Sequence, residues 1–461
     1  MKAGYWPTTG VAISLPLEAR ATCQAAYWGK LLLAVALIAW CAALWIGFTQ
    51  ALSILTIVGL AAAMAGLRKP VLGLLGVGML CTLDAPARIF LLTGGVLRWN
   101  TINYWLLLVI LLSRPPAIFQ RDPHSRLLRG LILLFGLELV VSPDFWAGLQ
   151  SVLEVVVFFG VLVYFARGTR DPEVWYWLGL LNGVLGAIGG FIYYLGKARL
   201  PYADPNALAD LQLTALSCIC LGVRFSGVRR RGQTLLVFLT AANCVWVFLG
   251  GSRGGMAIAA LCGLFQLSTT RGVLRRCLIA AAAVFAGLWL SLLFPDQREL
   301  ALRRMEMLWD PNRSLANKTS GRSDLASDGW FIFVRHPLGV GTGGFAPVRA
   351  QYSLWYAGEG ISNFKRGVEM VAHSGWVKVL VENGVPGVLL LAGYVLSFAV
   401  EGWRQRKRGL LGLGLLVTGT FAVGLIPHLF EHKGPWFLAA AATVLFRGQP
   451  VRARPPLSHG G

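Results

Sequence analysis

Long apolar runs, separated by short polar connections, fill most of this chain of 461 residues. A run of about 20 apolar residues can cross a bilayer as a helix, which satisfies its own backbone hydrogen bonds there. Only 14% of the residues are charged, whereas soluble domains carry about a quarter. The pattern predicts an all-α polytopic membrane protein with about 12–14 transmembrane helices. The runs lie near 31–48, 51–67, 71–83, 101–113, 127–141, 151–167, 174–195, 207–223, 234–250, 254–269, 276–294, 375–400, 409–426 and 435–447.

Basic residues gather in alternate connections, and this asymmetry predicts the orientation of the chain. The formal net charge is +21, and cytoplasmic loops of membrane proteins are enriched in Lys and Arg. Placing both termini in the cytoplasm puts most basic clusters inside, where they meet anionic membrane lipids. Nucleic acid is not a favoured partner, because no basic stripe with interleaved aromatic residues is visible. The clusters predicted to be cytoplasmic are 68–69, 114–129, 167–170, 224–231, 271–276, 404–408 and 447–454.

One long polar interval of mixed charge interrupts the apolar pattern, and the predicted orientation places it outside the cytoplasm. Its segments 297–308 and 322–335 are predicted helices, the second capped by Ser320 or Ser323. We expect a small helical subdomain that rests on the outer surface of the bundle. The predicted division is an N-terminal transmembrane bundle over 1–294, a large extracytoplasmic loop over 295–371, C-terminal transmembrane helices over 372–447 and a cytoplasmic tail over 448–461.

Two arginines on the outer side are candidates for binding an anion. Arg253 lies in a Gly-Ser-Arg-Gly-Gly break between two apolar runs, against the positive-inside trend. Arg322 follows Ser320-Gly321 at the start of a predicted helix, whose N-terminus also favours an anion. One guanidinium group can donate two parallel hydrogen bonds to phosphate oxygens, so the two arginines together could clamp a diphosphate. The alternatives are an arginine among lipid headgroups and an ordinary surface arginine.

His373 stands where the polar interval returns to the membrane. Imidazole is the side chain best matched to proton transfer near neutral pH. From spacing alone, a histidine bonded to the backbone at the interface is the favoured interpretation, with proton transfer as the alternative.

Two further motifs match functional patterns but lack the surroundings that those patterns need. Gly339-x-Gly341-x-x-Gly344 fits a dinucleotide fingerprint, but no strand precedes it, so we expect a tight glycine-rich turn. The motif His428-Leu-Phe-Glu-His432 fits a zinc pattern that needs a third ligand, and few candidates follow it. We therefore predict neither a metal site nor a cofactor.

Several short motifs follow one another between residues 200 and 400. They are Asp204-Pro-Asn206, Ser252-Arg253-Gly-Gly, Ser320-Gly-Arg322 with the later Trp330, His336-Pro-Leu-Gly-Val-Gly-x-Gly-x-Phe345, and His373 with Glu382-Asn-Gly-Val-Pro-Gly387. In this order they resemble the O-antigen ligase and O-antigen polymerase superfamily of bacterial membrane glycosyltransferases. The sequence departs from the usual pattern at Ser374, where many members have Asn, and in the long insert 350–370.

The resemblance implies a GT-C-like helical bundle that moves a glycan from an undecaprenyl-diphosphate carrier to an acceptor hydroxyl. The transfer would take place on the outer face of the bacterial inner membrane. The resemblance implies that Arg253 and Arg322 bind the diphosphate and that His373 accepts the hydroxyl proton, giving inversion without a metal ion. Preplaced cations would stabilise the leaving diphosphate. Implied substrate contacts are Ser252, Trp330, Asn206 and Glu382.

The acceptor stays open, as do other classes of function. A ligase would glycosylate a lipid A-core, a polymerase a growing polysaccharide and an oligosaccharyltransferase a protein. An anion transporter is another alternative, but transporters usually show mid-span charges and two related halves. Here Glu138 and Glu154 are the main acidic residues within apolar runs, and no repeat is visible. A non-catalytic assembly component is a third class.

Overall fold

The computed structural model describes most of the chain, and every regular element in the described residues is a helix. This confirms the predicted all-α class. The described residues are 17–46, 48–90, 123–169, 171–196, 205–226, 230–269, 322–356, 374–424 and 433–447, with isolated positions between 281 and 310. The helices are α1 (Leu17–Ile46), α2 (Phe48–Ala65), α3 (Pro70–Phe90), α5 (Pro123–Glu138), η2 (Leu139–Val141), α6 (Phe145–Gly168), α7 (Glu173–Gly196), α8 (Pro205–Phe225), α9 (Arg230–Gly250), α10 (Arg253–Thr269), α14 (Arg322–Arg335), α15 (Phe345–Tyr356), α16 (Gly375–Arg404), η4 (Arg406–Arg408), α17 (Leu411–Gly424) and α18 (Lys433–Arg447).

Apolar length makes this a multi-pass membrane protein. Four described helical segments are long and apolar enough to cross a bilayer, and four shorter apolar helices accompany them. The predicted total of 12–14 also counts the runs 101–113 and 276–294, which lie wholly or mostly outside the described residues, so the total stays a prediction. The long segments are Gln24–Ile46, Glu173–Tyr193, Gly232–Gly250 and Gly375–Arg404.

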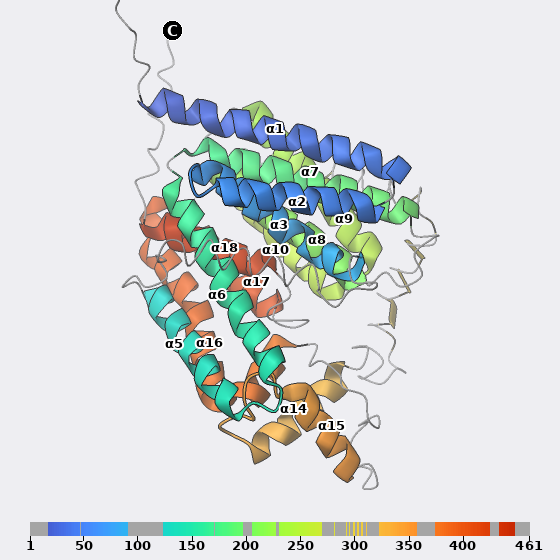
Figure 1. Ribbon diagram of the computed structural model, residues 1–461, viewed down its shortest axis with the longest axis vertical. Coiled ribbons are helices and arrows are strands. Elements are labelled where there is room, and N and C mark those ends of the chain that lie inside the picture. Colours follow the sequence, from blue (N-terminus) through green and yellow to red (C-terminus); the bar gives the residue numbers. More distant parts are fainter. Residues whose placement is uncertain are drawn as a thin grey trace, which may run out of the picture.

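Close helix contacts in the upper part of the bundle depend on small residues. In Figure 1, α1, α2 and α7 lie side by side, and α7 packs against α1, α8 and α9. A Cβ added at Gly186 or Gly190 of α7 would lie within 3 Å of side chains on α8 or α9. Small residues of this kind allow membrane helices to approach each other closely.

Hydrogen bonds between side chains and neighbouring helices join the same region. Thr82 of α3 donates to the Asn182 side chain of α7 at 2.8 Å. Asn243 of α9 donates to the Gly183 carbonyl of α7 at 3.0 Å. In a bilayer such hydrogen bonds help hold helices together. Apolar side chains alone give little preference for a neighbouring helix over lipid tails, which are equally apolar.

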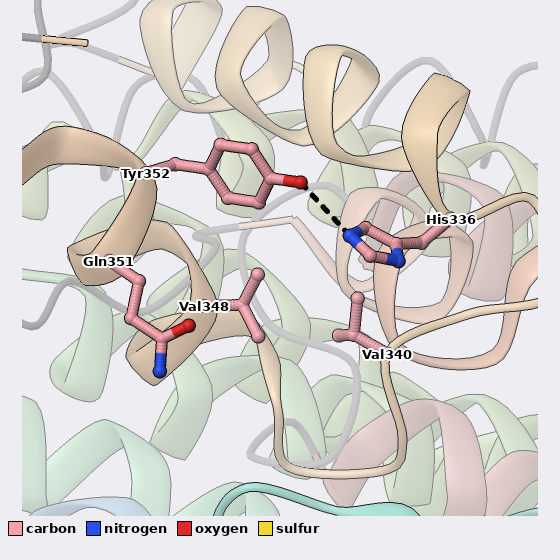
Figure 2. A pocket seen from close by; sticks show the side chains of 5 residues that line it. All are labelled: His336, Val340, Val348, Gln351 and Tyr352. Carbon is pink, nitrogen blue, oxygen red and sulfur yellow. Dashed lines mark hydrogen bonds between the residues drawn. The ribbon is translucent and has the colours of Figure 1, made fainter. Parts of the chain in front are cut away.

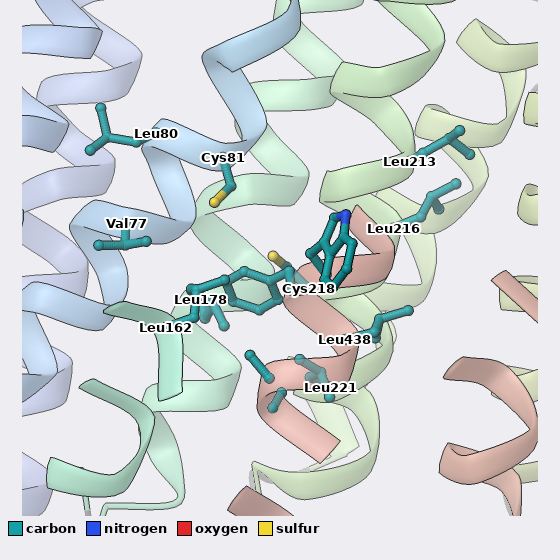
Figure 3. Close-up of a cluster of buried hydrophobic side chains, with 14 of the residues drawn as sticks. Val77, Leu80, Cys81, Leu162, Leu178, Leu213, Leu216, Cys218, Leu221 and Leu438 are labelled. Carbon is teal, nitrogen blue, oxygen red and sulfur yellow. The ribbon is translucent and has the colours of Figure 1, made fainter. Parts of the chain in front are cut away.

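A single large hydrophobic cluster fills the centre of the bundle. Figure 3 shows side chains from α3, α6, α7, α8 and α18 meeting there, with the thiols of Cys81 and Cys218 among leucines. Burial of this kind agrees with these thiols acting as small apolar groups. The cluster fixes α18 against α6 and α8.

The lower part of the structure carries α14 (Arg322–Arg335) and α15 (Phe345–Tyr356), which come from the long polar interval. In Figure 1, α5, α6 and α16 run toward one end of the molecule, and α14 and α15 lie at that end. The predicted helix 322–335 is confirmed as α14. Described residues within the predicted helix 297–308 are also helical, and Arg303 pairs with Glu299 there. The proposed cap Ser323 lies inside α14, and Ser320 lies outside the described residues. Helix α15 was not predicted.

Candidate functional site

The N-terminal part of α16 contains a break, and a glycine-rich turn supplies the hydrogen bonds missing there. Gly384 has φ 59° and ψ −154°, which is non-helical, and Pro386 follows it. Proline has no N–H, so the Glu382 carbonyl loses the partner that a continuous helix would supply. The turn supplies substitutes: Val340 N donates to the Val381 carbonyl at 3.0 Å and Gly341 N to the Glu382 carbonyl at 2.9 Å.

A hydrogen bond in the opposite direction, from α16 to the segment after α14, joins the same two parts of the chain. The backbone N–H of Val385 donates to the Pro337 carbonyl at 3.0 Å. Gly339 has φ 99°, and a Cβ there would lie 2.3 Å from the Glu382 carbonyl oxygen. Only glycine tolerates both that φ and that contact. The tight glycine-rich turn predicted for 339–344 is therefore confirmed.

A polar cluster beneath the turn ties it to α5. The buried Asn383 side chain donates to Glu138 and, at 2.8 Å, to the Thr342 hydroxyl. Thr342 in turn donates to the Phe135 carbonyl at 3.2 Å. Three segments far apart in sequence thus share one hydrogen-bonded network, which rigidifies this end of the bundle.

The Glu382 carboxyl group lies inside the protein and accepts backbone N–H groups. It accepts from Phe345 N at 3.3 Å and also from Gly343 N. Phe345 begins α15, whose N-terminus favours a carboxylate. Lys378, one turn earlier on α16, donates to the Ser151 hydroxyl at 3.2 Å and attracts the Glu382 carboxyl group electrostatically.

A buried ion pair holds α14 and α15 together. Arg349 Nε donates to Asp328 Oδ2 at 2.9 Å, and the two side chains are 2% and 0% exposed. Breaking such a pair would leave an uncompensated charge. Gly329 and Ile332 on the same face of α14 are buried, and α14 packs against α16. Helices α14 and α15 are therefore fixed to the N-terminal end of α16.

A pocket of about 340 Å³ opens between the end of α14 and α15. Figure 2 shows the imidazole of His336 and the hydroxyl of Tyr352 pointing toward each other, with the Gln351 carboxamide nearby. His336 Nε2 and the Tyr352 hydroxyl share a hydrogen bond of 2.9 Å. Val340 and Val348 supply apolar lining. A few polar groups over an apolar lining are typical of sites that bind and orient small ligands.

Ser252 and Arg253 form the start of α10. Gly251 turns the chain with φ 65°, and the Ser252 hydroxyl accepts from Gly255 N at 3.3 Å. Ser252 thus caps the helix, a role that explains its burial. Arg253 is half-buried as the first residue of α10, beside the helix N-terminus.

For three of the other predicted site residues, the side chain or the whole residue lies outside the described part of the chain. Arg322 is the first residue of α14, but its side chain lies outside the described residues. The same holds for Asn206, the second residue of α8. His373 lies outside them, directly before Ser374, whose hydroxyl accepts from Val377 N at 3.4 Å and caps α16. Trp330 is exposed on α14.

These placements bring some of the predicted residues together and leave others apart. Trp330 and Glu382 belong to the packed pair α14 and α16, whereas α10 with Arg253 packs against α8, α9 and α17. The zinc-like motif 428–432 lies outside the described residues. The Thr342–Asn383 bond and the Asp328–Arg349 pair were not predicted. The sequence Asn383-Gly-Val-Pro386 indicates a helix break beside an amide, but it does not identify the partner of that amide.

The fold and the site define a polytopic helical membrane protein. Helix α14, the glycine-rich turn and α15, together called the polar module, lie at one end of its bundle. Residues 235–392 match the sequence model of the O-antigen ligase family. The match contains Arg253, Arg322, Trp330, His373 and Glu382, and it confirms the resemblance drawn from the motifs. The family implies a membrane glycosyltransferase that uses lipid-linked glycans. No curated protein matches the chain.

Proposed function

We propose that this protein transfers a glycan from an undecaprenyl-diphosphate carrier to an acceptor hydroxyl on the outer face of the bacterial inner membrane. The observation that carries the proposal is the O-antigen ligase match over 235–392, the part of the chain that holds the polar module. Both predicted phosphate-binding arginines begin helices, Arg253 in α10 and Arg322 in α14. An anion at a helix N-terminus is stabilised by the free backbone N–H groups and the helix dipole.

The arginines act on the leaving group in this proposal. As the bond from the anomeric carbon to the diphosphate oxygen breaks, negative charge grows on the carrier diphosphate. A preplaced donor aimed at developing charge contributes about 3–4 kcal/mol to transition-state stabilisation. Guanidinium suits the task because it stays charged and offers paired donors to phosphate oxygens.

His373 acts on the acceptor. The acceptor oxygen forms a bond to the anomeric carbon while its proton passes to the imidazole, and undecaprenyl diphosphate leaves from the opposite side. The product has the inverted configuration, and no metal ion takes part. General-base assistance of this kind contributes about 10²–10⁴-fold to a rate. The pocket at His336 and Tyr352 offers donors and acceptors to sugar hydroxyls, which supports glycan binding at the module.

Glu382 takes a positioning role in the proposal instead of a direct substrate contact. Its carboxyl group is buried and bonded to the backbone of the turn and of α15. Ser252 likewise positions Arg253 by capping α10. Asn206 and Trp330 keep their predicted substrate contacts as hypotheses.

The test is complementation of a bacterial mutant that lacks the gene. Wild type, Arg253→Ala, Arg322→Ala and His373→Ala are compared by surface glycans on a gel, with membrane protein levels measured alongside. Arg303→Ala is the matched control, because Arg303 is an exposed arginine of the same polar interval and has no predicted role at the site. We expect the three site variants to lose the glycan and the control to restore it.

The accumulated product also distinguishes the acceptors. A ligase is indicated if the lipid A-core lacks glycan while long carrier-linked chains accumulate. A polymerase is indicated if single carrier-linked repeat units accumulate. Loss of a glycosylated protein instead indicates an oligosaccharyltransferase. Full restoration by all three site variants would refute the proposed site and favour the anion transporter.

A further inference from the structure

The exposed face of α14 changes character along its length. Toward its start this face carries polar Ser327, whereas toward its end it carries Trp330 and Val334, which are 59% and 58% exposed. Leu338, in the following turn, is 75% exposed. These three residues, four apart, form what we call the outer stripe. The buried face of the helix is already packed against α15 and α16, so the stripe is a second apolar surface.

The outer stripe joins an apolar surface of α16. The Val385 N–H is bonded to the Pro337 carbonyl, which places Leu338 beside the break in α16. Directly after the break, Val385 and Leu389 are 45% and 67% exposed. Between the start of α16 and the break, no described side chain is classed as exposed. Exposed apolar side chains on α16 therefore begin at the level of Leu338.

Helix length fixes where that level lies in a bilayer. The whole of α16, at 30 residues, is about 45 Å long, which exceeds a hydrocarbon core of about 30 Å. The part from Val385 to Arg404 is about 30 Å long and matches the core. It ends beside the basic η4, a position typical of the cytoplasmic boundary. The break at Gly384 therefore coincides with the outer edge of the hydrocarbon.

We propose that the outer stripe, Trp330, Val334 and Leu338, inserts into the outer leaflet and anchors the external helices α14 and α15 to the bilayer. Tryptophan favours this interfacial level, and aliphatic side chains are stabilised when lipid covers them. Arg335 is exposed beside the stripe and stacks on the Phe331 ring at 3.5 Å, which presents a cation to headgroup phosphates. Figure 1 shows α14 at the end of the bundle where α5 and α16 terminate.

This anchoring goes beyond the proposed transfer reaction and differs from the contact predicted for Trp330. An exposed tryptophan alone is also suited to stacking on a sugar ring. The aliphatic side chains of Val334 and Leu338 offer no such face, and their continuity with the lipid-facing side of α16 favours acyl chains. The occupant is therefore membrane lipid.

The experiment is site-specific photocrosslinking in the full-length protein. The residue p-benzoyl-L-phenylalanine replaces Trp330, Val334 or Leu338, one at a time, in protein reconstituted into bilayers of phosphatidylethanolamine and phosphatidylglycerol. Lipid adducts are measured by mass spectrometry after illumination. Leu389 on the span gives the reference yield, and Ser327 on the polar end of the same face is the matched control.

We expect all three stripe positions to give lipid adducts at yields close to that of Leu389 and several-fold above that of Ser327. Yields at the stripe equal to that of Ser327 would overturn the proposal. Adducts at Trp330 with a lipid-linked glycan, and none with phospholipid at Val334 and Leu338, would also overturn it and restore the sugar contact. Because the readout does not depend on glycosyl transfer, failure here is distinguishable from failure of the proposed function.

Discussion

Substitution of Glu382 separates a positioning role from a substrate contact. In Glu382→Ala, the N–H groups of Gly343 and Phe345 lose their buried acceptor. Each of these two buried donors costs about 1–2 kcal/mol when left unsatisfied, so the glycine-rich turn is destabilised locally by about 2–4 kcal/mol. Each 1.4 kcal/mol is a factor of ten in an equilibrium constant, so opening of the turn increases about 30- to 700-fold.

Amide hydrogen exchange of the purified protein in lipid nanodiscs measures that opening. Peptides that cover 339–345 should exchange faster in Glu382→Ala, while peptides from α7 should be unchanged. Glu382→Gln keeps an oxygen acceptor at the same place, and we expect it to lose about 1 kcal/mol of local stability. It should also keep most of the glycan transfer.

Either of two outcomes would refute the positioning role of Glu382. If Glu382→Ala abolishes transfer while exchange at 339–345 matches the wild type, the turn does not depend on this carboxyl group. Loss of transfer in Glu382→Gln with unchanged exchange would lead to the same conclusion. Glu382 would then be the substrate contact implied by its motif.

Two further perturbations test other parts of the structure. Asp328→Ala should destabilise the protein by about 3–5 kcal/mol, because Arg349 stays buried without its carboxylate. The double variant Asp328→Leu with Arg349→Met should recover most of the loss in thermal unfolding, and a wild-type-like single variant would contradict the argument. Chelation by EDTA should leave glycan transfer unchanged, because arginines are proposed to supply the positive charge. Loss of transfer that added Mg²⁺ restores would disprove this.

Helix positions were largely predictable because the composition of a span is set locally by the hydrocarbon around it. The apolar run 207–223 became α8 (Pro205–Phe225), and the amphipathic segment 322–335 became α14 with the same bounds. The prediction for α1 was less accurate, since this helix begins at Leu17, well before its apolar run at residue 31. Residues 17–30 are rich in alanine, which favours a helix without being part of the apolar run.

The site was only partly predictable, because its bonds join segments far apart in sequence. Ser252 and Arg253 could be placed at a helix start from the glycines around them. In contrast, the network of Thr342, Asn383 and Glu138 connects three distant segments, and no local pattern specifies such pairing. Pro386 in an apolar run was a local sign of a break in α16. It could not reveal that the turn after α14 supplies the missing donors.

The bonds from the turn to α16 have a consequence for how the protein is made. Synthesis runs from the N-terminus, so on the proposed topology the turn crosses to the outer side before the ribosome has produced the helix that it completes. Without the turn, the carbonyl groups of Val381 and Glu382 would meet the outer edge of the hydrocarbon without these donors. On the proposed topology, the donors that complete this span are therefore synthesised and translocated before the span itself. If the loop and the membrane part were made as separate chains, each would lack hydrogen-bond partners that the other supplies.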